Sequence, residues 1–163
     1  LSTLNIEYFN MHLGYAITSR LNNNRNKYLK NTVEFLNDNC LDSNIVISIE
    51  NTYSKRGDFS NIGNNVKDFE YIFNNTIRKK ICFCYDTGHF LINKDDYIDK
   101  LSEKIKIVHL SDNDGTIDSH IGIGKGILCM NHIKKILEYN PEYLVLEIDY
   151  KDIKDTLINL KSL

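Results

Sequence analysis

The chain has 163 residues, of which 42% are hydrophobic and 26% charged, and its formal net charge is −2 at pH 7. This length and composition are typical of a globular protein, so we expect one domain over residues 1–163. No apolar run approaches the roughly 18 residues that a membrane-spanning helix needs, and the balanced charge excludes strong general attraction to nucleic acid or anionic membranes. No secretory signal is recognisable, so we expect a cytoplasmic protein.

Five short apolar runs predict β-strands, and the segments between them have apolar residues at helical spacing. The expected strands are Ile6–Gly14, Ile45–Thr52, Ile81–Gly88, Ile105–Asp112 and Tyr143–Asp149. The helical stripes are Leu29, Val33 and Leu36; Val66, Phe69, Ile72 and Phe73; Tyr97 and Leu101; Ile133, Ile136 and Leu137; and Ile153, Leu157 and Leu160. Helix-start signals stand near Asp95, Asn131 and Asp152. Strands that alternate with helices predict an α/β fold with a parallel sheet.

The expected strands have two unlike faces. In the third run every second residue is bulky and apolar, whereas the alternate residues are smaller and end in Asp86. The second and fifth runs end in the same way, in Glu50 and Glu147. An apolar outer face that packs on helices, with polar groups at the strand ends, is typical of a closed barrel whose site lies at the C-terminal mouth. This pattern therefore favours a (β/α) barrel of the TIM type over an open, doubly wound sheet.

The four cysteines are Cys40, Cys82, Cys84 and Cys129, and none of them forms a C-x-x-C pair. We interpret them as reduced, buried, small hydrophobic residues. A zinc-binding role for Cys82-Phe83-Cys84 is the alternative interpretation.

Ligand-type side chains stand at the ends of successive expected strands. They are His12, Glu50, Asp86 with His89, His109 and Glu147. Steps of 38, 36, 23 and 38 residues separate His12, Glu50, Asp86, His109 and Glu147, close to one βα unit each. The loop after His109 adds Asp118 and His120. Carboxylates mixed with imidazoles suit a divalent ion such as Mn²⁺, Mg²⁺, Co²⁺ or Zn²⁺, so we predict a metal site at the barrel mouth.

Each of these residues also has a structural explanation. Asp86 is suited to cap a following helix, or to open a simple turn at Asp86-Thr87-Gly88. Glu50 is compatible with a solvated loop charge, and His109 with a hydrogen-bonded core histidine. The regular spacing and the shared face of the set favour the metal site over these separate explanations.

The order of these motifs resembles the xylose isomerase-like TIM-barrel superfamily. That superfamily includes sugar-phosphate isomerases and epimerases, and AP endonucleases of the endonuclease IV type. The motifs are Ile49-Glu50-Asn51-Thr52, Asp86-Thr87-Gly88-His89, His109-Leu110-Ser111-Asp112, Asp118-Ser119-His120 and Gly122-Ile123-Gly124-Lys125-Gly126. The glycine-containing stretch by itself does not match a phosphate-binding loop, because it lacks the Lys-Ser/Thr pair and a preceding strand.

The resemblance also implies that the barrel is incomplete. A full barrel of eight βα units takes roughly 250 residues, whereas this chain offers about five units. Matching His12 to the H-x-G strand end of the family places the chain on strands 4 to 8. We therefore expect a truncated chain, a natural remnant, or an oligomer or partner that completes the barrel.

The resemblance implies a metal-dependent sugar or sugar-phosphate isomerase or epimerase. The implied ligands of one ion are Glu50, Asp86, His109 and Glu147. Glu50 and Glu147 would exchange a proton with the substrate as base and acid, and His89 would orient it. The expected partner is a small sugar or sugar phosphate.

The alternative that the resemblance implies is zinc-dependent hydrolysis of phosphodiesters at abasic DNA sites. His89, Asp118 and His120 would then hold a further ion, and His12 with Glu50 another. The nine-residue step from His109 to Asp118 and the absence of a basic patch disfavour this nuclease. A third possibility, which follows from the missing strands, is an inactive barrel fragment or binding module.

Overall fold

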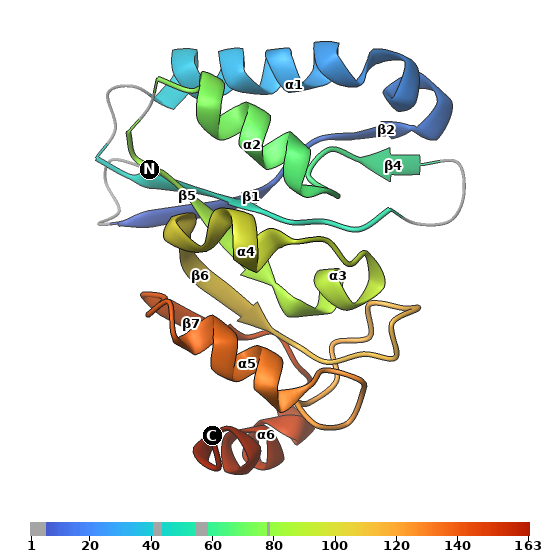
Figure 1. The fold of residues 1–163 in the computed structure, drawn as a ribbon, viewed down its shortest axis with the longest axis vertical. Helices are drawn as coiled ribbons and strands as arrows, with labels where there is room; N and C mark the ends of the chain where they lie inside the picture. The colour runs from blue at the N-terminus through green and yellow to red at the C-terminus, as the bar shows by residue number, and fades with distance from the viewer. Residues whose placement is uncertain (1–5, 41–43, 55–58, 78) are drawn as a thin grey trace.

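A curved, parallel β-sheet lies at the centre of the computed structural model, which describes residues 6–40, 44–54, 59–77 and 79–163 (Figure 1). Its five strands are hydrogen-bonded in the order β1-β3-β5-β6-β7, and each neighbouring pair is parallel. They are β1 (Tyr8–His12), β3 (Val46–Glu50), β5 (Ile81–Asp86), β6 (Ile105–Leu110) and β7 (Tyr143–Leu146). This architecture confirms the predicted α/β fold and the partial TIM barrel.

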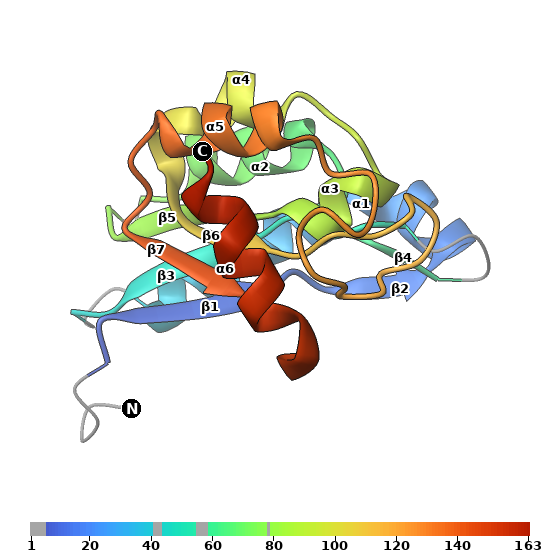
Figure 2. The same ribbon diagram turned by 90° about the horizontal axis from the view of Figure 1, so that it is seen from below.

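Helices follow the strands in chain order down the molecule in Figure 1, and Figure 2 shows α2, α4 and α5 on one side of the strands. They are α1 (Thr18–Cys40, interrupted at Asn24), α2 (Val66–Asn75), α4 (Tyr97–Leu101) continued by the 3-10 turn η1 (Ser102–Lys104), α5 (Met130–Leu137), and α6 (Ile153–Lys161) after the 3-10 turn η2 (Tyr150–Asp152). Every predicted helical stripe lies in one of these helices. Within the described residues, no helix combines the length and the apolar character needed to cross a membrane.

The helix-facing side of β5 carries the aromatic core, as the two-faced strand pattern predicts. Phe83 and Tyr85 are fully buried. The Phe83 ring lies 4.8 Å from the ring of Phe69 in α2 and 5.8 Å from that of Tyr97 in α4. Rings at these separations add to the stability that burial of their area provides. The alternate residues of β5, which end in Asp86, point to the concave side of the sheet.

The two edge strands of the sheet contact each other at their N-terminal ends. Tyr8 of β1 and Tyr143 of β7 pack edge to face, with ring centroids 5.4 Å apart. The Tyr8 hydroxyl donates a hydrogen bond to the Glu142 carboxylate, and the Tyr143 hydroxyl donates one to Glu7 Oε2 at 3.3 Å. The sheet is therefore curved enough to bring strands 134 residues apart in sequence into side-chain contact.

Replacing Tyr8 by Phe should destabilise the fold slightly. The change keeps the ring and removes the hydroxyl that donates to Glu142. Because this bond is mostly exposed, we expect a loss of about 0.5–1 kcal/mol in the free energy of unfolding, measured by urea denaturation. Tyr143→Phe, which removes the longer bond, is the matched comparison and should cost less. Equal stability of Tyr8→Phe and the wild type would show that this edge contact does not support the fold.

Two features of the fold were not predicted. A second, antiparallel sheet pairs β2 (Tyr15–Ile17) with β4 (Phe59–Asn61), and three-residue strands are too short to show a period in the sequence. The short helix α3 (Thr87–Ile92) begins where the strand prediction still extends to Gly88. Asp86 is its N-cap, because Asp86 Oδ1 accepts a hydrogen bond from His89 N at 2.7 Å. The capping explanation for Asp86 is thus correct.

Two helix-start signals act differently from the prediction. Asp96, rather than Asp95, is the N-cap of α4. Asp95 Oδ2 instead accepts a hydrogen bond from Val66 N, the first residue of α2, at 2.8 Å. Asp152 occupies the N-cap position of α6, but its side chain makes no capping bond there and accepts from Gly122 N at 2.9 Å. Both carboxylates therefore join segments that are distant in sequence.

Cys129, rather than Asn131, is the N-cap residue of α5, without a side-chain capping bond. Its thiol is exposed, so the prediction that all cysteines are buried is wrong for Cys129. The prediction is confirmed for Cys82 and Cys84, which are free and buried within β5.

Candidate metal centre

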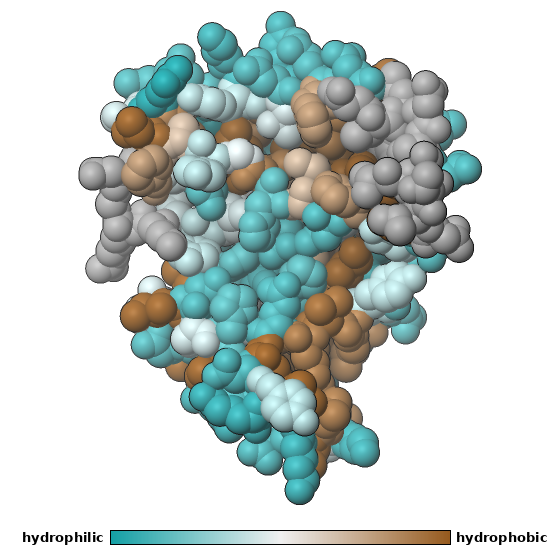
Figure 3. Space-filling model, turned by 180° about the vertical axis from the view of Figure 1, so that it is seen from behind, coloured by the Kyte–Doolittle hydropathy of each residue, from teal (hydrophilic) through white to brown (hydrophobic). Residues whose placement is uncertain are grey.

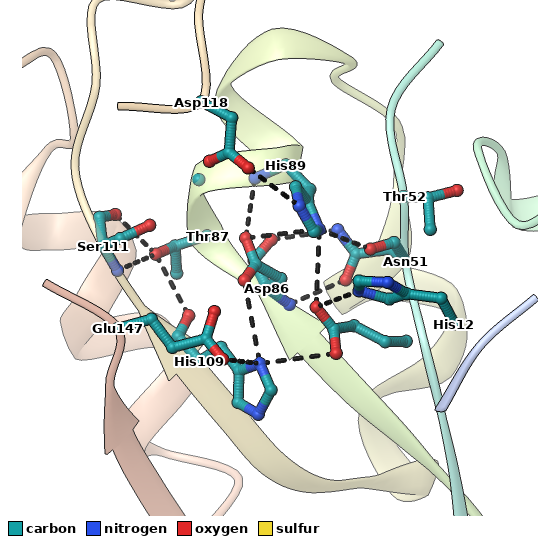
Figure 4. A network of polar contacts seen from close by, with 12 residues as sticks. His12, Asn51, Thr52, Asp86, Thr87, His89, His109, Ser111, Asp118 and Glu147 are labelled. Atoms are coloured by element: carbon teal, nitrogen blue, oxygen red, sulfur yellow. Dashed lines mark hydrogen bonds and ion pairs between the residues drawn. The ribbon is translucent and has the colours of Figure 1, made fainter. Parts of the chain in front are cut away.

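Four ligand-type side chains converge where the parallel strands end (Figure 4). Glu50 comes from β3, Asp86 from β5, His109 from β6 and Glu147 from the residue after β7. Their ligand atoms all lie within 4.8 Å of one another. From His109 Nδ1 the distances are 3.0 Å to Glu147 Oε1, 3.4 Å to Glu50 Oε2 and 3.8 Å to Asp86 Oδ2. The structure thus brings together the four residues that the resemblance implied as ligands of one ion.

Strand register produces this convergence. Asp86 lies opposite His109 in the pairing of β5 with β6, and His12 lies opposite Glu50 in the pairing of β1 with β3. Paired residues in a sheet project from the same face, here the concave one. Glu147 N donates to Leu110 O at 3.1 Å, which continues the ladder one residue beyond β7. Seen from behind, hydrophilic side chains form a band across the molecule between apolar patches (Figure 3).

Burial places the carboxylates of this centre in two different states. Glu50 is 2% exposed; burial alone would raise its pKa, but the neighbouring imidazoles of His109 and His12 outweigh that effect and hold the pKa below its ordinary value. Asp86 is 0% exposed, and its burial raises its pKa to about 6 despite the opposing effect of His89. Without an ion, Glu50 is therefore charged, whereas Asp86 titrates close to neutral pH.

A divalent cation fits the unsatisfied atoms of this centre. Asp86 Oδ2 is buried without a hydrogen-bond partner. His109 Nδ1 lies 3.0 Å from Glu147 Oε1 but is likewise buried without a hydrogen-bond partner. Buried polar atoms without partners cost free energy, and coordination to one ion would satisfy both. Three carboxylates and one imidazole also suit Mn²⁺, Mg²⁺, Co²⁺ or Zn²⁺.

A second ligand group shares Glu50 with this centre. The ligand atoms of His12, Glu50 and His89 also lie within 4.8 Å of one another. His12 Nε2 is 3.0 Å from Glu50 Oε1, and its side chain is 57% exposed, so solvent reaches this flank of the centre.

A third group surrounds Asp118 in the loop after β6. His89 Nε2 and His120 Nε2 each lie 3.2 Å from Asp118 Oδ2. The other ring nitrogens are occupied: His89 Nδ1 contacts Asn51 O at 2.8 Å, and His120 Nδ1 contacts Glu147 O at 2.9 Å. Such backbone contacts orient imidazoles toward a metal position. Burial lowers the pKa of His89, but the hydrogen bond to Asp118 and nearby carboxylates outweigh burial and raise it to about 9.

Two supporting asparagines were missed at the sequence level. Asn51 Nδ2 donates to Asp86 O at 2.9 Å and Asn51 Oδ1 accepts from Asp86 N at 2.7 Å, so this side chain fixes the backbone of a ligand residue. Asn10 Nδ2 donates to Glu50 Oε2 at 2.5 Å. The available signals were the position of Asn51 directly after Glu50 and the shared face of Asn10 and His12.

The Gly122–Gly126 stretch wraps around a carboxylate of the protein itself. Asp112 is fully buried, and its Oδ2 accepts from Gly124 N at 3.1 Å and Gly126 N at 2.9 Å. A Cβ atom on Gly126 would lie 2.3 Å from Asn113 O, so no larger residue fits there without a shift. These amides are therefore already engaged, which agrees with the conclusion that this stretch is no phosphate loop.

Comparison with known proteins gives the family. The family model described as "Xylose isomerase-like TIM barrel" matches residues 1–162. The chain belongs to this family. This xylose isomerase-like chain is 27% identical over 157 residues to "Probable endonuclease 4" of Thermosipho africanus, a match that covers 85% of the chain and 54% of that protein. The chain spans about half the length of the curated endonuclease 4 relatives it matches.

Several solved structures share the fold of this chain. A D-tagatose 3-epimerase-like protein superposes with a TM-score of 0.71 at 24% identity, over 96% of this chain and 61% of that one. The IOLI protein with a binding zinc atom gives a TM-score of 0.72 at 17% identity, over 98% of this chain and 64% of that one. The relatives thus include epimerase-like and endonuclease 4 proteins, and one of the similar structures contains zinc.

Proposed function

We propose that this chain carries the metal and proton-transfer centre of a sugar or sugar-phosphate isomerase or epimerase. The observation that supports the proposal best is the pair of glutamates at His109. Glu50 and Glu147 come from strands that are not neighbours in the sheet, yet both lie within 3.4 Å of His109 Nδ1. Two carboxylates that reach one ion position from different sides suit a base and an acid on opposite sides of a substrate carbon.

Glu50, Asp86, His109 and Glu147 would hold the ion. When bound, a divalent ion polarises a substrate carbonyl and makes the neighbouring C–H bond more acidic. Glu50 is kept charged by His12 and His109, as a general base requires. The Glu147 side chain is 33% exposed, so it has access to a substrate in the mouth. His89, held through its Nδ1 contact with Asn51, would orient that substrate.

A cavity beside the centre offers space for such a substrate. Its volume is about 420 Å³. It is lined by His12, Tyr15, Thr52, Tyr53, Phe59, Asn61, His89 and Asp118. The aromatic rings provide apolar contacts for the C–H faces of a sugar, and the hydroxyl and amide groups provide hydrogen-bond partners for its hydroxyl groups. The mixed lining supports a small carbohydrate as the partner of this chain.

An isotope-exchange assay tests this function. We expect the chain, loaded with Mn²⁺ in D₂O, to introduce deuterium next to the carbonyl of L-ribulose or D-tagatose and to form the epimer, as followed by NMR. Glu147→Gln is the negative control. Exchange without added metal, or equal exchange by the control, would contradict the proposal. Binding of these sugars without exchange would favour a binding module.

Phosphodiester hydrolysis is the second candidate, and the group around Asp118 favours it. Two imidazole nitrogens each lie 3.2 Å from Asp118 Oδ2, and the group of His12, Glu50 and His89 beside them offers a position for a further ion. Several ions near one phosphodiester would stabilise both its attacking and its leaving oxygen. Three results together would support this candidate over the isomerase. They are cleavage of a DNA duplex at a single abasic site, two or more zinc ions per chain by elemental analysis, and no deuterium exchange into a sugar.

A further inference from the structure

A buried thiol lies beneath the candidate metal centre. Cys84 is on the concave face of β5, two residues before Asp86, and the register of β3 with β5 places it opposite Glu50. Cys84 is 0% exposed. Cys84 lies on the face of β5 that carries the metal ligands. The helices pack on the opposite face, so packing against them does not explain a cysteine at this position.

The thiol is close enough to two ligands to share an ion with them. Ligand atoms of Glu50, Cys84 and His109 all lie within 4.8 Å of one another, and all three residues are buried. Within this group His109 Nδ1 is a buried nitrogen without a hydrogen-bond partner. An ion shared with Cys84 would give this nitrogen the partner that the protein atoms do not supply.

We propose that Glu50, Cys84 and His109 form an alternative metal position for thiophilic ions such as Zn²⁺ or Cd²⁺, overlapping the position formed with Asp86 and Glu147. Thiolates select soft ions, whereas carboxylates suit hard ions such as Mg²⁺ and Mn²⁺. The two positions share Glu50 and His109, so an ion bound to Cys84 displaces an ion held by the carboxylates. This position would select between metals by ligand type, whichever reaction the centre performs.

Binding at this position converts the thiol into a thiolate. A cysteine coordinates a metal ion as its thiolate. On binding, the S–H bond breaks, its electron pair forms the S–metal bond and the proton passes to solvent. No electron is transferred. Metal uptake in this position therefore releases the thiol proton to solvent.

Titration with Cd²⁺ tests the assignment through thiolate-to-metal charge-transfer absorption in the ultraviolet. Cys82 is the matched control, because it is buried on the same face of the same strand but lies outside the ligand group. We expect the band in the wild type and in Cys82→Ser, and its loss in Cys84→Ser. A wild type without the band, a band that persists in Cys84→Ser, or a band lost in Cys82→Ser would each overturn the proposal.

A second measurement does not depend on how well the variants fold. The ¹¹³Cd NMR signal of the loaded wild type should show the strong downfield shift that a sulfur ligand causes. A ¹¹³Cd shift typical of oxygen and nitrogen ligands alone would show that Cys84 does not coordinate the ion.

Discussion

Glu147→Gln should lower the rate of substrate proton exchange by about 100- to 10,000-fold, the range that one general acid or base contributes. The amide keeps the shape of the side chain and its proximity to His109, but it cannot accept a proton at neutral pH. Because Glu147 is one-third exposed and contributes its backbone rather than its carboxylate to the β6–β7 ladder, the fold should persist. Solvent deuterium incorporation into the sugar, followed by NMR, measures the effect.

Glu142→Gln is the control for this prediction. Glu142 precedes the same strand and is exposed at its N-terminal end, where it pairs with Lys106 at 2.8 Å, away from the candidate metal centre. Its substitution should leave exchange unchanged. If Glu147→Gln exchanges deuterium at the wild-type rate, proton transfer does not use the two glutamates.

Without metal, Asp86→Asn should be more stable than the wild type. With metal added, the wild type should gain stability and the variant should not. Ionised Asp86 is penalised by burial, which raises its pKa from 3.8 to about 6. Because this pKa is higher in the folded than in the unfolded chain, the free energy of unfolding falls as the pH rises from 3.8 to about 6. It stays lowered by the full amount above pH 6. At pH 8 with chelator we expect the variant to be more stable by about 1–3 kcal/mol. Below pH 4 this gain should vanish.

Added Mn²⁺ or Zn²⁺ should stabilise the wild type and not the variant. A ligand at 100 times its dissociation constant contributes about 2.7 kcal/mol to the stability of the state that binds it. The Asp86→Asn side chain keeps an oxygen that can accept from His89 N, so the cap of α3 is preserved. Glu103→Gln, at an exposed position in the 3-10 turn η1, is the control and should change neither measurement. Denaturation curves at pH 4 and pH 8 check both effects; a wild type more stable than Asp86→Asn at pH 8 without metal would contradict the burial penalty.

The alternation of residues along the strands made the fold and much of the candidate centre predictable. A side chain in a strand points to one of two faces, so Glu50 and Asp86 could be placed on the concave face before any contact was known. Successive βα units then bring strand ends together at one mouth. The roles assigned to these residues in catalysis and metal binding stay predictions, because neither position nor burial identifies a reaction.

Features that depend on contacts between distant segments could not be predicted in this way. Asn51 supports Asp86 through two hydrogen bonds across 35 residues, and Asp95 accepts from the first turn of a helix 29 residues earlier. The residues next to Asp95 in the sequence indicate only that a helix begins there, and they do not indicate its hydrogen bond to α2. The exposure of Cys129 likewise depends on how α5 packs, and not on the hydrophobic character of cysteine.

The way Asp112 holds its loop has a consequence for how this protein can diverge. Asp112 accepts hydrogen bonds from the backbone N–H groups of Asn113, Gly124, Gly126 and Leu128. The loop that these residues span is therefore held by its backbone, and most of its side chains take no part in these bonds. Asp118 lies within the anchored segment. The exposed residues of the loop are therefore free to mutate while Asp118 keeps its position. Evolution can thus alter what such a mouth recognises without rebuilding the ligands beneath it.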